Sequence, residues 1–572
     1  MSMTALFMAL LCCCGAQAQT TSSSSSNGSK GVIAGRVIGA DGQPLSGVTV
    51  RAVSPQSGSA SARPSLTDEE GRFQFTGLTL TAYSLSAALP AHVTASMTGG
   101  TGEAGLVQNG DVVTITMVKG GVITGRVIDS TGEPVPGLRV KAVRLRDAGG
   151  KPVNASTDRR TDDRGVYRIF GLSPGVYVVH TDGATADWSW LPDEYIEDAP
   201  TYHPSSSRDT ATELALQNGV ELNGIDIRYR GERGHSVSGK LFDAGGGGGS
   251  DIYLQHAASG EILASDWRVV RSNMEGVGFE IRGVADGEYD LVAERLRGDD
   301  DGAVSSPQRV SVRGANVSGV ELRMRPLASV TGKMSMAETK SENKQSASPG
   351  ACAGAQAGVF EEASMTLLPE TGARRGANSA TARSATPSRQ GDFKIRHLNA
   401  GRYRFDAQLP TETWYAQSIS RIDPQTKRPV DLARNGLAIK SGEKLSDVNI
   451  TIGAGAASLN GRVKDAEGRK PPTNLKVHLI PAEKESVEDI LRYFEVKAAD
   501  DGAFAFNHVA PGRYLMTTRA LPDESTDQNP IAWDNAGRLK LRRAAEILNI
   551  AVEFQPCQKI KGYELKYAQP SR

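Results

Sequence analysis

The feature that most constrains the fold is a pattern that the 572-residue chain repeats along its length. Each copy has a polar turn, a short strand of alternating residues, a second turn and then Gly-x-Tyr or its remnant. The copies read "DEEGRFQFTGL" (68–78), "TDDRGVYRIFGLSPGVYVV" (161–179), "GVGFEIRGVADGEY" (276–289), "GDFKIRHLNAGRY" (391–403) and "DDGAFAFNHVAPGRY" (500–514). Strand, turn and strand at such short intervals predict a β-hairpin in every copy.

Two further signatures bracket each hairpin. A Gly-Arg-Val type strand opens each copy, as in "IAGRVIGADGQPLSGVTV" from Ile33, and its glycine falls at Gly35, Gly125, Gly239, Gly332 and Gly461. An alternating segment closes each copy: "GDVVTITM", "GVELNGIDIRY", "GANVSGVELRM", "GEKLSDVNITI" and finally "AAEILNIAVEF". The sequence therefore predicts five tandem units of small-domain size, numbered 1 to 5 at 31–119, 120–231, 232–326, 327–454 and 455–556, followed by a tail at 557–572.

The side-chain pattern within a unit indicates an all-β sandwich. Tyr167 and Ile169 face one side of a strand while Val166 and Arg168 face the other, and the chain is rich in glycine (63 residues) and poor in aromatics (6%). Polar inserts at 337–358 and 371–390 of unit 4 are expected to be disordered, and 483–496 of unit 5 is expected to form a short helix.

The "ITGRV…G-x-P-x-x-G" opening and the "D-x-x-G-x-[FY]-x-[FI]…L-x-P-G-x-Y" hairpin resemble the carboxypeptidase regulatory-like domain, a transthyretin-like or Cna B-type β-sandwich. The likeness is strong in units 1, 2 and 5 and fair in units 3 and 4. It implies antiparallel, prealbumin-like Greek-key sandwiches of about seven strands with a carbohydrate-binding-like fold. It does not imply peptidase activity.

The N-terminal residues predict export. The apolar run "ALFMALLCCCG" (5–15) precedes "AQAQ", which suits cleavage after Ala18, although residues 1–4 carry no Lys or Arg. A signal peptide at 1–18 and a Ser-rich linker at 19–30 follow, and the mature chain is expected to be secreted, periplasmic or at the cell surface. Cleavage would leave two cysteines, Cys352 and Cys557, and whether they pair is left open.

Catalytic motifs are weak in this sequence. Gly171–Gly175 fits the G-x-S-x-G pattern of a hydrolase around Ser173, but the next residue is Pro174, which has no N–H to serve an oxyanion. "GHSVSGKL" (234–241) nearly matches a phosphate-binding loop but has Leu241 where Ser or Thr would hold magnesium. Both motifs are interpreted as parts of the repeat, so the chain is expected not to be an enzyme.

Metals, cofactors and nucleic acid are not expected. The eight histidines lack zinc-peptidase spacing, and the acidic turns "TDEEG", "TDDRG" and "ADDG" suit turn chemistry better than calcium binding. Lys plus Arg and Asp plus Glu both total 65, so no basic excess favours nucleic acid. After the signal, no apolar stretch is long enough to span a membrane.

Aromatic residues after the Gly-x-Tyr strands form the candidate binding surface. Trp188 and Trp414 each lie eleven residues after matching tyrosines, Tyr177 and Tyr403. The candidate carbohydrate-binding residues are Trp188, Trp190, Tyr195, Tyr202, Trp414, Tyr415 and Trp533. Exposed rings could stack on sugars, whereas the alternative interpretation has these rings pack extra strands or loops onto the sandwiches.

The sequence thus predicts a non-enzymatic exterior array of sandwiches that binds polysaccharide or another cell-surface component. The alternative is a structural or adhesive spacer that engages protein partners, and a hydrolase is the distant third hypothesis.

Overall fold

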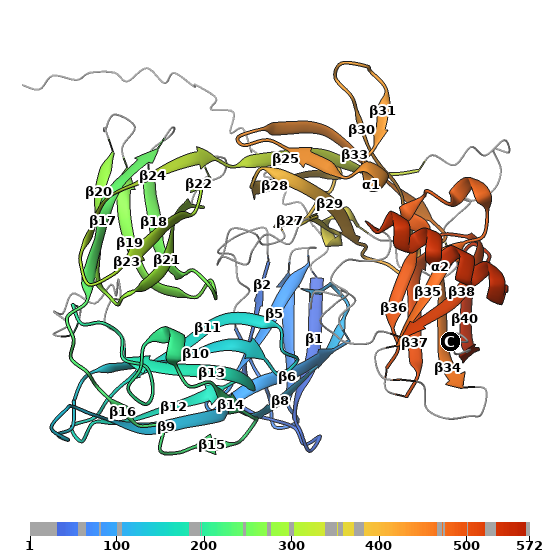
Figure 1. Ribbon diagram of the computed structural model, residues 1–572. Helices are drawn as coiled ribbons and strands as arrows, with labels where there is room; N and C mark the ends of the chain where they lie inside the picture. Colours follow the sequence, from blue (N-terminus) through green and yellow to red (C-terminus); the bar gives the residue numbers. More distant parts are fainter. Residues whose placement is uncertain are drawn as a thin grey trace, which may run out of the picture.

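The computed structural model describes most of the chain. The described residues are 31–54, 64–78, 82–99, 106–181, 195, 197–243, 248–270, 276–296, 302–337, 352, 359–370, 383–465, 472, 475–499, 501–520 and 533–567. They form a mostly β-stranded molecule whose strands gather in chain order into successive layered groups, from blue to red in Figure 1. The expected signal peptide and Ser-rich linker fall outside the described residues.

Units 1 and 2 are each built from two facing sheets. Unit 1 has sheets β4-β1-β8-β6 and β3-β2-β5-β7, and unit 2 has β12-β9-β15, with β16 also on β9, and β11-β10-β13-β14. The unit 1 strands are β1 (Gly31–Gly39), β2 (Thr49–Val53), β3 (Ser65–Leu66), β4 (Arg72–Leu78), β5 (Tyr83–Ala88), β6 (His92–Thr98), β7 (Leu106–Val107) and β8 (Val112–Lys119). The unit 2 elements are β9 (Gly121–Ile128), β10 (Arg139–Asp147), β11 (Pro152–Arg160), β12 (Val166–Leu172), β13 (Gly175–Thr181), the 3-10 turn η1 (Arg208–Thr210), β14 (Leu214–Leu216), β15 (Glu221–Leu222) and β16 (Ile227–Arg228).

In unit 3 the two layers are joined into one sheet of order β19-β18-β21-β22-β24-β17-β20, with β23 paired to β21. The short strand β22 makes the join because it pairs with β21 on one side and β24 on the other. The strands are β17 (His235–Asp243), β18 (Gly248–His256), β19 (Ile262–Val270), β20 (Val277–Val284), β21 (Gly287–Arg295), β22 (Ala303–Ser305), β23 (Gln308–Val312) and β24 (Val317–Pro326).

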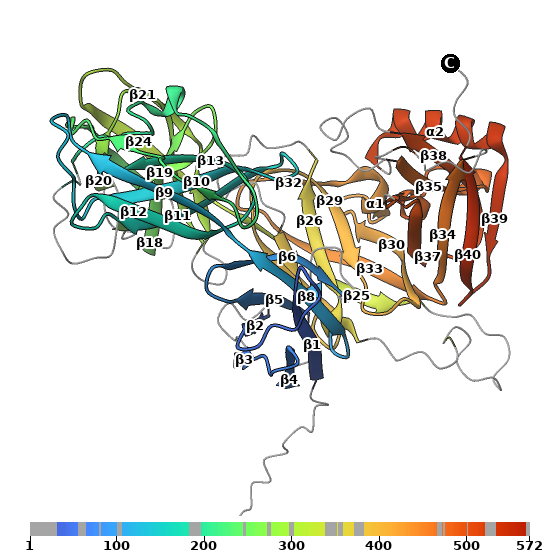
Figure 2. The ribbon, with the colours of Figure 1, turned by 90° about the horizontal axis from the view of Figure 1, so that it is seen from below.

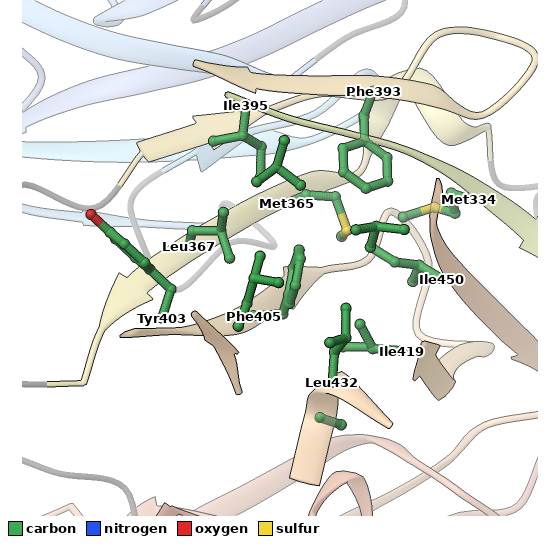
Figure 3. Close-up of a cluster of buried hydrophobic side chains, with 14 of the residues drawn as sticks. Met334, Met365, Leu367, Phe393, Ile395, Tyr403, Phe405, Ile419, Leu432 and Ile450 are labelled. Carbon is green, nitrogen blue, oxygen red and sulfur yellow. The ribbon is translucent and has the colours of Figure 1, made fainter. Parts of the chain in front are cut away.

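Unit 4 has sheets β28-β25-β33-β30-β31 and β27-β26-β29-β32. Figure 3 shows side chains of both sheets pointing into one core, with Phe393 and Ile395 of β28 above Met365, Leu367 and Phe405. The elements are β25 (Ala328–Met336), η2 (Phe360–Glu362), β26 (Ser364–Pro369), β27 (Arg383–Ala385), β28 (Asp392–Leu398), β29 (Gly401–Gln408), β30 (Trp414–Ile422), β31 (Pro429–Asp431), α1 (Leu432–Asn435), β32 (Leu437–Ile439) and β33 (Lys444–Ala454).

Unit 5 has sheets β37-β34-β40 and β36-β35-β38-β39, with a helix over the second sheet (Figure 2). The helix buries Leu541 and Ala545 against Ile480 and Leu515 of that sheet. The elements are β34 (Ala457–Asp465), β35 (Leu475–Pro481), η3 (Lys484–Ser486), η4 (Ile490–Arg492), β36 (Phe494–Lys497), β37 (Ala503–Val509), β38 (Gly512–Ala520), α2 (Asn535–Leu548), β39 (Ile550–Phe554) and β40 (Lys559–Tyr567).

Three expectations for units 4 and 5 are wrong. Segment 483–496 is not a helix, because it forms η3, η4 and the start of β36. The signature "AAEILNIAVEF" is half helix, and the strand that closes unit 5 is β40, in the segment assigned to a tail. Residues 383–385, assigned to a disordered insert, form β27, which pairs with β26.

The fold of every unit rests on one repeated ladder. The opening strand (β1, β9, β17, β25 or β34) pairs antiparallel with the strand of the hairpin signature on one side and parallel with the closing strand on the other. A separate cluster of buried hydrophobic side chains fills each unit. The all-β sandwich prediction is confirmed, but each unit contains this parallel pair where only antiparallel sheets were expected.

The opening glycine is required by this ladder. Gly35 lies directly opposite Phe73 on the neighbouring strand, and Gly125 lies opposite Tyr167. The same glycine-aromatic pair recurs as Gly239–Phe279, Gly332–Phe393 and Gly461–Phe504. At each site a Cβ would collide with the aromatic side chain and with a carbonyl of the closing segment, so the ring occupies the space that glycine leaves.

The Gly-x-Tyr signature also has a structural cause. The Tyr177 hydroxyl donates a hydrogen bond of 2.6 Å to the carbonyl of Ser173, four residues earlier. Tyr289, Tyr403 and Tyr514 make the same bond to Ala285, Asn399 and Ala510. These bonds fix the turn before the strand, much as a tyrosine corner does in immunoglobulin domains.

Consecutive units are joined by a repeated backbone hydrogen bond. A residue just before each opening strand donates its N–H to a carbonyl of the preceding unit. The pairs are Gly120 to Ala91 (2.9 Å), Gly234 to Glu197 (2.8 Å), Leu327 to Gly302 (2.8 Å) and Ala456 to Thr413 (2.9 Å). In units 1, 3 and 4 the accepting residue directly precedes a strand, which is β6, β22 or β30. Each of these strands pairs with the closing strand of its own unit. The joints that follow units 1, 3 and 4 therefore share one backbone geometry.

Candidate functional site

The aromatic residues predicted for unit 2 do not form an exposed platform in the part of the chain that the structure describes. Trp188 and Trp190 lie outside the described residues. Tyr202 is only 2% exposed and stacks on His180, with ring centroids 4.6 Å apart. Tyr195 packs edge-on against Tyr229 at 5.9 Å, beside the unit 2 core. Because Tyr202 is buried, its ring is not available for stacking on a sugar.

The aromatic residues predicted for units 4 and 5 are packed within the protein. Trp414 is 9% exposed, belongs to the unit 4 core and packs on Phe360 at 5.5 Å. Trp533 of unit 5 packs against that same core, and Tyr415 is half-buried against Gly453. Burial raises the pKa of the Tyr415 hydroxyl. These contacts fit the alternative interpretation, in which the rings hold parts of the molecule together.

Ser173 and the 234–241 segment have structural places. The Ser173 carbonyl accepts the bond from Tyr177 in the turn between β12 and β13, so this serine belongs to a hairpin. Residues from His235 to Leu241 lie in the opening strand β17, which leaves no strand-to-helix loop for a phosphate.

In the acidic turns, the aspartate carboxylates accept hydrogen bonds from backbone N–H groups of the same turn. Asp162 accepts hydrogen bonds from the N–H groups of Arg164 (3.0 Å) and Val166 (2.8 Å), and Asp68 makes the same kind of bonds in unit 1. The bond from the Val166 amide is the main cause that lowers the pKa of Asp162. Within the described ranges, no group of three or more His, Cys, Asp or Glu residues could hold a metal ion.

A hollow of about 570 Å³ lies where unit 2 meets unit 3. Unit 2 contributes Asp209, from η1. Unit 3 contributes residues at the β18–β19 turn, at the β20–β21 turn and in or next to β23. The lining residues are Asp209, His256, Ala257, Ala258, Asp286, Gly287, Glu288, Arg309, Val312 and Arg313. A narrower cleft, lined in part by Leu254, Leu263, Val284 and Tyr289, adjoins it and shares Asp209, His256 and Asp286.

The turn η1 positions this hollow by docking on the β18–β19 hairpin. Arg208 Nε lies 2.5 Å from Glu261 Oε2, and the Glu261 side chain is only 3% exposed. The neighbouring Asp209 Oδ1 lies 3.0 Å from His256 Nε2. Two side-chain pairs thus clamp unit 2 to unit 3, beside the backbone bond from Gly234 to Glu197.

One arrangement at this clamp resembles an acid, base and nucleophile. His256 Nδ1 lies 3.0 Å from Ser259 Oγ while its Nε2 faces Asp209. However, the Gly260 N–H, which follows the serine, already donates to the His256 carbonyl, and the Glu261 N–H points to Ser259 Oγ. Those amides would be the expected oxyanion donors. The arrangement therefore serves the hairpin turn and the joint better than it serves catalysis.

The exposed rim of the hollow carries both signs of charge. Asp286 accepts a hydrogen bond of 2.7 Å from the Gly314 N–H, and its Oδ1 lies 3.4 Å from His235 Nε2. Glu288 accepts from Ser311 Oγ at 2.7 Å and from Arg313 at 3.2 Å. The bonds from Ser311 and then Arg313 lower the pKa of Glu288, so this carboxylate stays ionised at neutral pH. Acceptors and donors thus both line the rim.

Sequence reasoning missed this hollow. Its residues come from η1 and from turns of unit 3 that are far apart in the chain, and they follow no motif with fixed spacing. The only signal in the sequence is polar residues at the hairpin ends, which every unit has.

Two further observations concern the whole chain. No helix among the described residues is long and apolar enough to cross a membrane. Cys352 and Cys557 form a disulfide bond that connects a residue of the first unit 4 insert to the turn between β39 and β40 of unit 5, which settles the pairing that the sequence left open.

Comparison with known protein families matches units 1 and 2. Residues 32–117 and 122–186 match the model of the carboxypeptidase regulatory-like domain, in two tandem copies. No curated protein sequence matches the chain.

Several solved structures resemble the chain distantly. The Bacillus anthracis TIE protein is 10% identical over 78% of this chain and 74% of that chain, with a TM-score of 0.15. GBS52, the minor pilin of Streptococcus agalactiae, is 12% identical over 35% of this chain and 96% of its own, with a TM-score of 0.19. BcpA, the major pilin subunit of Bacillus cereus, is 11% identical over 51% of this chain and 99% of its own, with a TM-score of 0.12. At these values the likenesses assign no function to this chain.

Proposed function

We propose that this protein is an exported, non-enzymatic array of β-sandwiches that binds polysaccharide at the cell exterior. The observation that carries the proposal is the polar hollow between units 2 and 3, whose 570 Å³ lies within the usual range of small-molecule sites. Within each unit, by contrast, the repeated residues pack in the core, form the turns or pair in the β-ladder.

Export is supported by the disulfide bond. The only cysteines outside the expected signal peptide are Cys352 and Cys557, and they are bonded to each other. Such bonds persist in secreted and periplasmic proteins and are rare in the reducing cytosol of mesophiles. The expected signal peptide at 1–18 agrees with this location.

Polysaccharide binding is tested by retention of the purified mature protein on insoluble glycans, followed by a glycan array. We expect retention that soluble oligosaccharides of the same linkage compete away. A protein that passes unretained through every glycan tested would contradict the proposal.

A second candidate function, a spacer that engages protein partners, is favoured by the backbone bond found at all four joints. Each joint repeats the same backbone bond, which suits a protein that holds its ends at a set distance. Small-angle scattering distinguishes a fixed arrangement, with one sharp shape, from a flexible string. A fixed shape combined with no glycan retention would favour the spacer.

A further inference from the structure

We propose that the hollow between units 2 and 3 is the glycan-binding site and that it selects neutral saccharides over charged ones. This inference rests on the proposed polysaccharide-binding function and adds the place and the ligand class. It moves the site away from the aromatic residues that the sequence suggested.

The mixture of charges on the rim determines the ligand class. Asp209, Asp286 and Glu288 offer carboxylate acceptors, while Arg309 and Arg313 offer guanidinium donors. A sugar hydroxyl both donates and accepts, so a row of hydroxyls can bond to both kinds of group. A charged ligand of either sign meets like charge on this rim: a polyanion is repelled by the three carboxylates, and a polycation is repelled by the two guanidinium groups and competes with Arg313 and His256 for carboxylates already bonded to them.

The polar groups are held in place before a ligand arrives. Arg309 is fixed by two bonds to Asp290, at 2.6 and 3.1 Å. Asp209 is held by His256, and Asp286 by the Gly314 N–H. A site whose side chains are already ordered loses less conformational entropy when it binds, which favours affinity for a weakly interacting, well-hydrated ligand.

The test is a calorimetric titration of the full mature protein with neutral gluco- and xylo-oligosaccharides and, in parallel, with oligogalacturonate and a lysine oligopeptide. The double variant Asp286→Asn, Glu288→Gln keeps the size of both side chains and removes two ionised acceptors. We expect it to bind a neutral oligosaccharide at least about tenfold more weakly, since hydrogen bonds to charged groups contribute most to such binding.

Glu321→Gln is the matched control, because Glu321 is an exposed carboxylate of the same unit that bonds Arg323 and does not line the hollow. We expect its affinity to equal that of the wild type, and thermal unfolding verifies that both proteins fold. Unchanged glycan affinity in the double variant would overturn the site while leaving polysaccharide binding intact. Preference for oligogalacturonate or the lysine peptide would overturn the ligand class. Binding of none of the probes, together with no retention on glycans, would overturn the proposed function as well.

Discussion

The joint between units 2 and 3 and the joint between units 4 and 5 share a backbone bond but are filled in opposite ways. At the 4/5 joint, Trp533 and Ile490 of unit 5 pack on the unit 4 core. The His508 ring also reaches the Trp414 carbonyl at 2.9 Å. At the 2/3 joint, charged pairs such as Arg208–Glu261 make the contact and a hollow remains beside them. The ladder and the joint bond thus set the spacing between consecutive units. The side chains at each joint determine whether it is closed by packing or leaves room for a ligand.

The largest expected effect is at the sealed joint. Trp414→Ala removes a nearly buried indole from the unit 4 core and from its contact with Phe360, so we expect a loss of about 3–5 kcal/mol in the free energy of unfolding. Chemical denaturation followed by circular dichroism measures it. Tyr415→Phe is the matched control, because it keeps the neighbouring ring. A fully stable Trp414→Ala variant would show that the indole is not a core residue.

A somewhat smaller effect is expected at the open joint. Arg208→Ala leaves Glu261 buried without its main ion-pair partner, and breaking such a pair costs about 3 kcal/mol. Limited proteolysis between units 2 and 3 should accelerate. The exposed pair Arg323–Glu321 offers the control, because Arg323→Ala should cost less than about 1 kcal/mol. Equal costs for the two variants would mean that the clamp is not buried in solution.

The disulfide bond should reinforce the sealed joint. Its two cysteines are 205 residues apart in the chain, so Cys557→Ser is expected to cost about 2–4 kcal/mol through the larger entropy of the unfolded chain. Thermal unfolding with and without reductant measures this, and the variant should be insensitive to reductant. A wild-type protein whose unfolding does not respond to reductant would argue against the bond.

The smallest expected effect concerns a third contact, between units 1 and 4. Gln108 of unit 1 donates to the Glu362 carbonyl at 2.7 Å. Burial, and then the negative charges of Asp111 and Glu361, raise the pKa of Glu362 to about 7. Because the pKa of Glu362 is higher in the folded than in the unfolded state, its protonated carboxyl contributes to the free energy of unfolding. That contribution is fully present below about pH 4.5 and is lost as the pH rises to about 7.

The pH effect is measured as the unfolding midpoint at a series of pH values between 4.5 and 8. Ionisation of Glu362 should lower the unfolding midpoint by roughly 2–4 °C over this range. The decrease is small because Glu362 is only half-buried. Glu362→Gln should flatten that part of the profile, and Glu361→Gln should change it less. Identical profiles for wild type and Glu362→Gln would exclude the contact as the source.

The sequence predicted the elements that repeat and missed those that occur once. The opening glycine and its opposing aromatic, such as Gly35 and Phe73, recur in all five units, so their spacing revealed the ladder. Helix α2 has no counterpart among the described residues of the other units, and its last residues, Ala545 among them, were interpreted as part of a closing strand because they precede an alternating segment. The hollow could not be predicted, since Asp209 and Glu288 are brought together only by the docking of one unit on another.

The single-residue boundaries after units 1 and 3 have a consequence for how the array can change. Only Gly120 separates β8 from β9, and only Leu327 separates β24 from β25. Inward and outward positions alternate with every residue of a strand, so one extra residue at such a boundary would exchange the two faces of whatever follows. The downstream part of the molecule would have to turn by about half a revolution to bury its core again. Whole units can therefore be gained or lost in evolution more easily than single boundary residues.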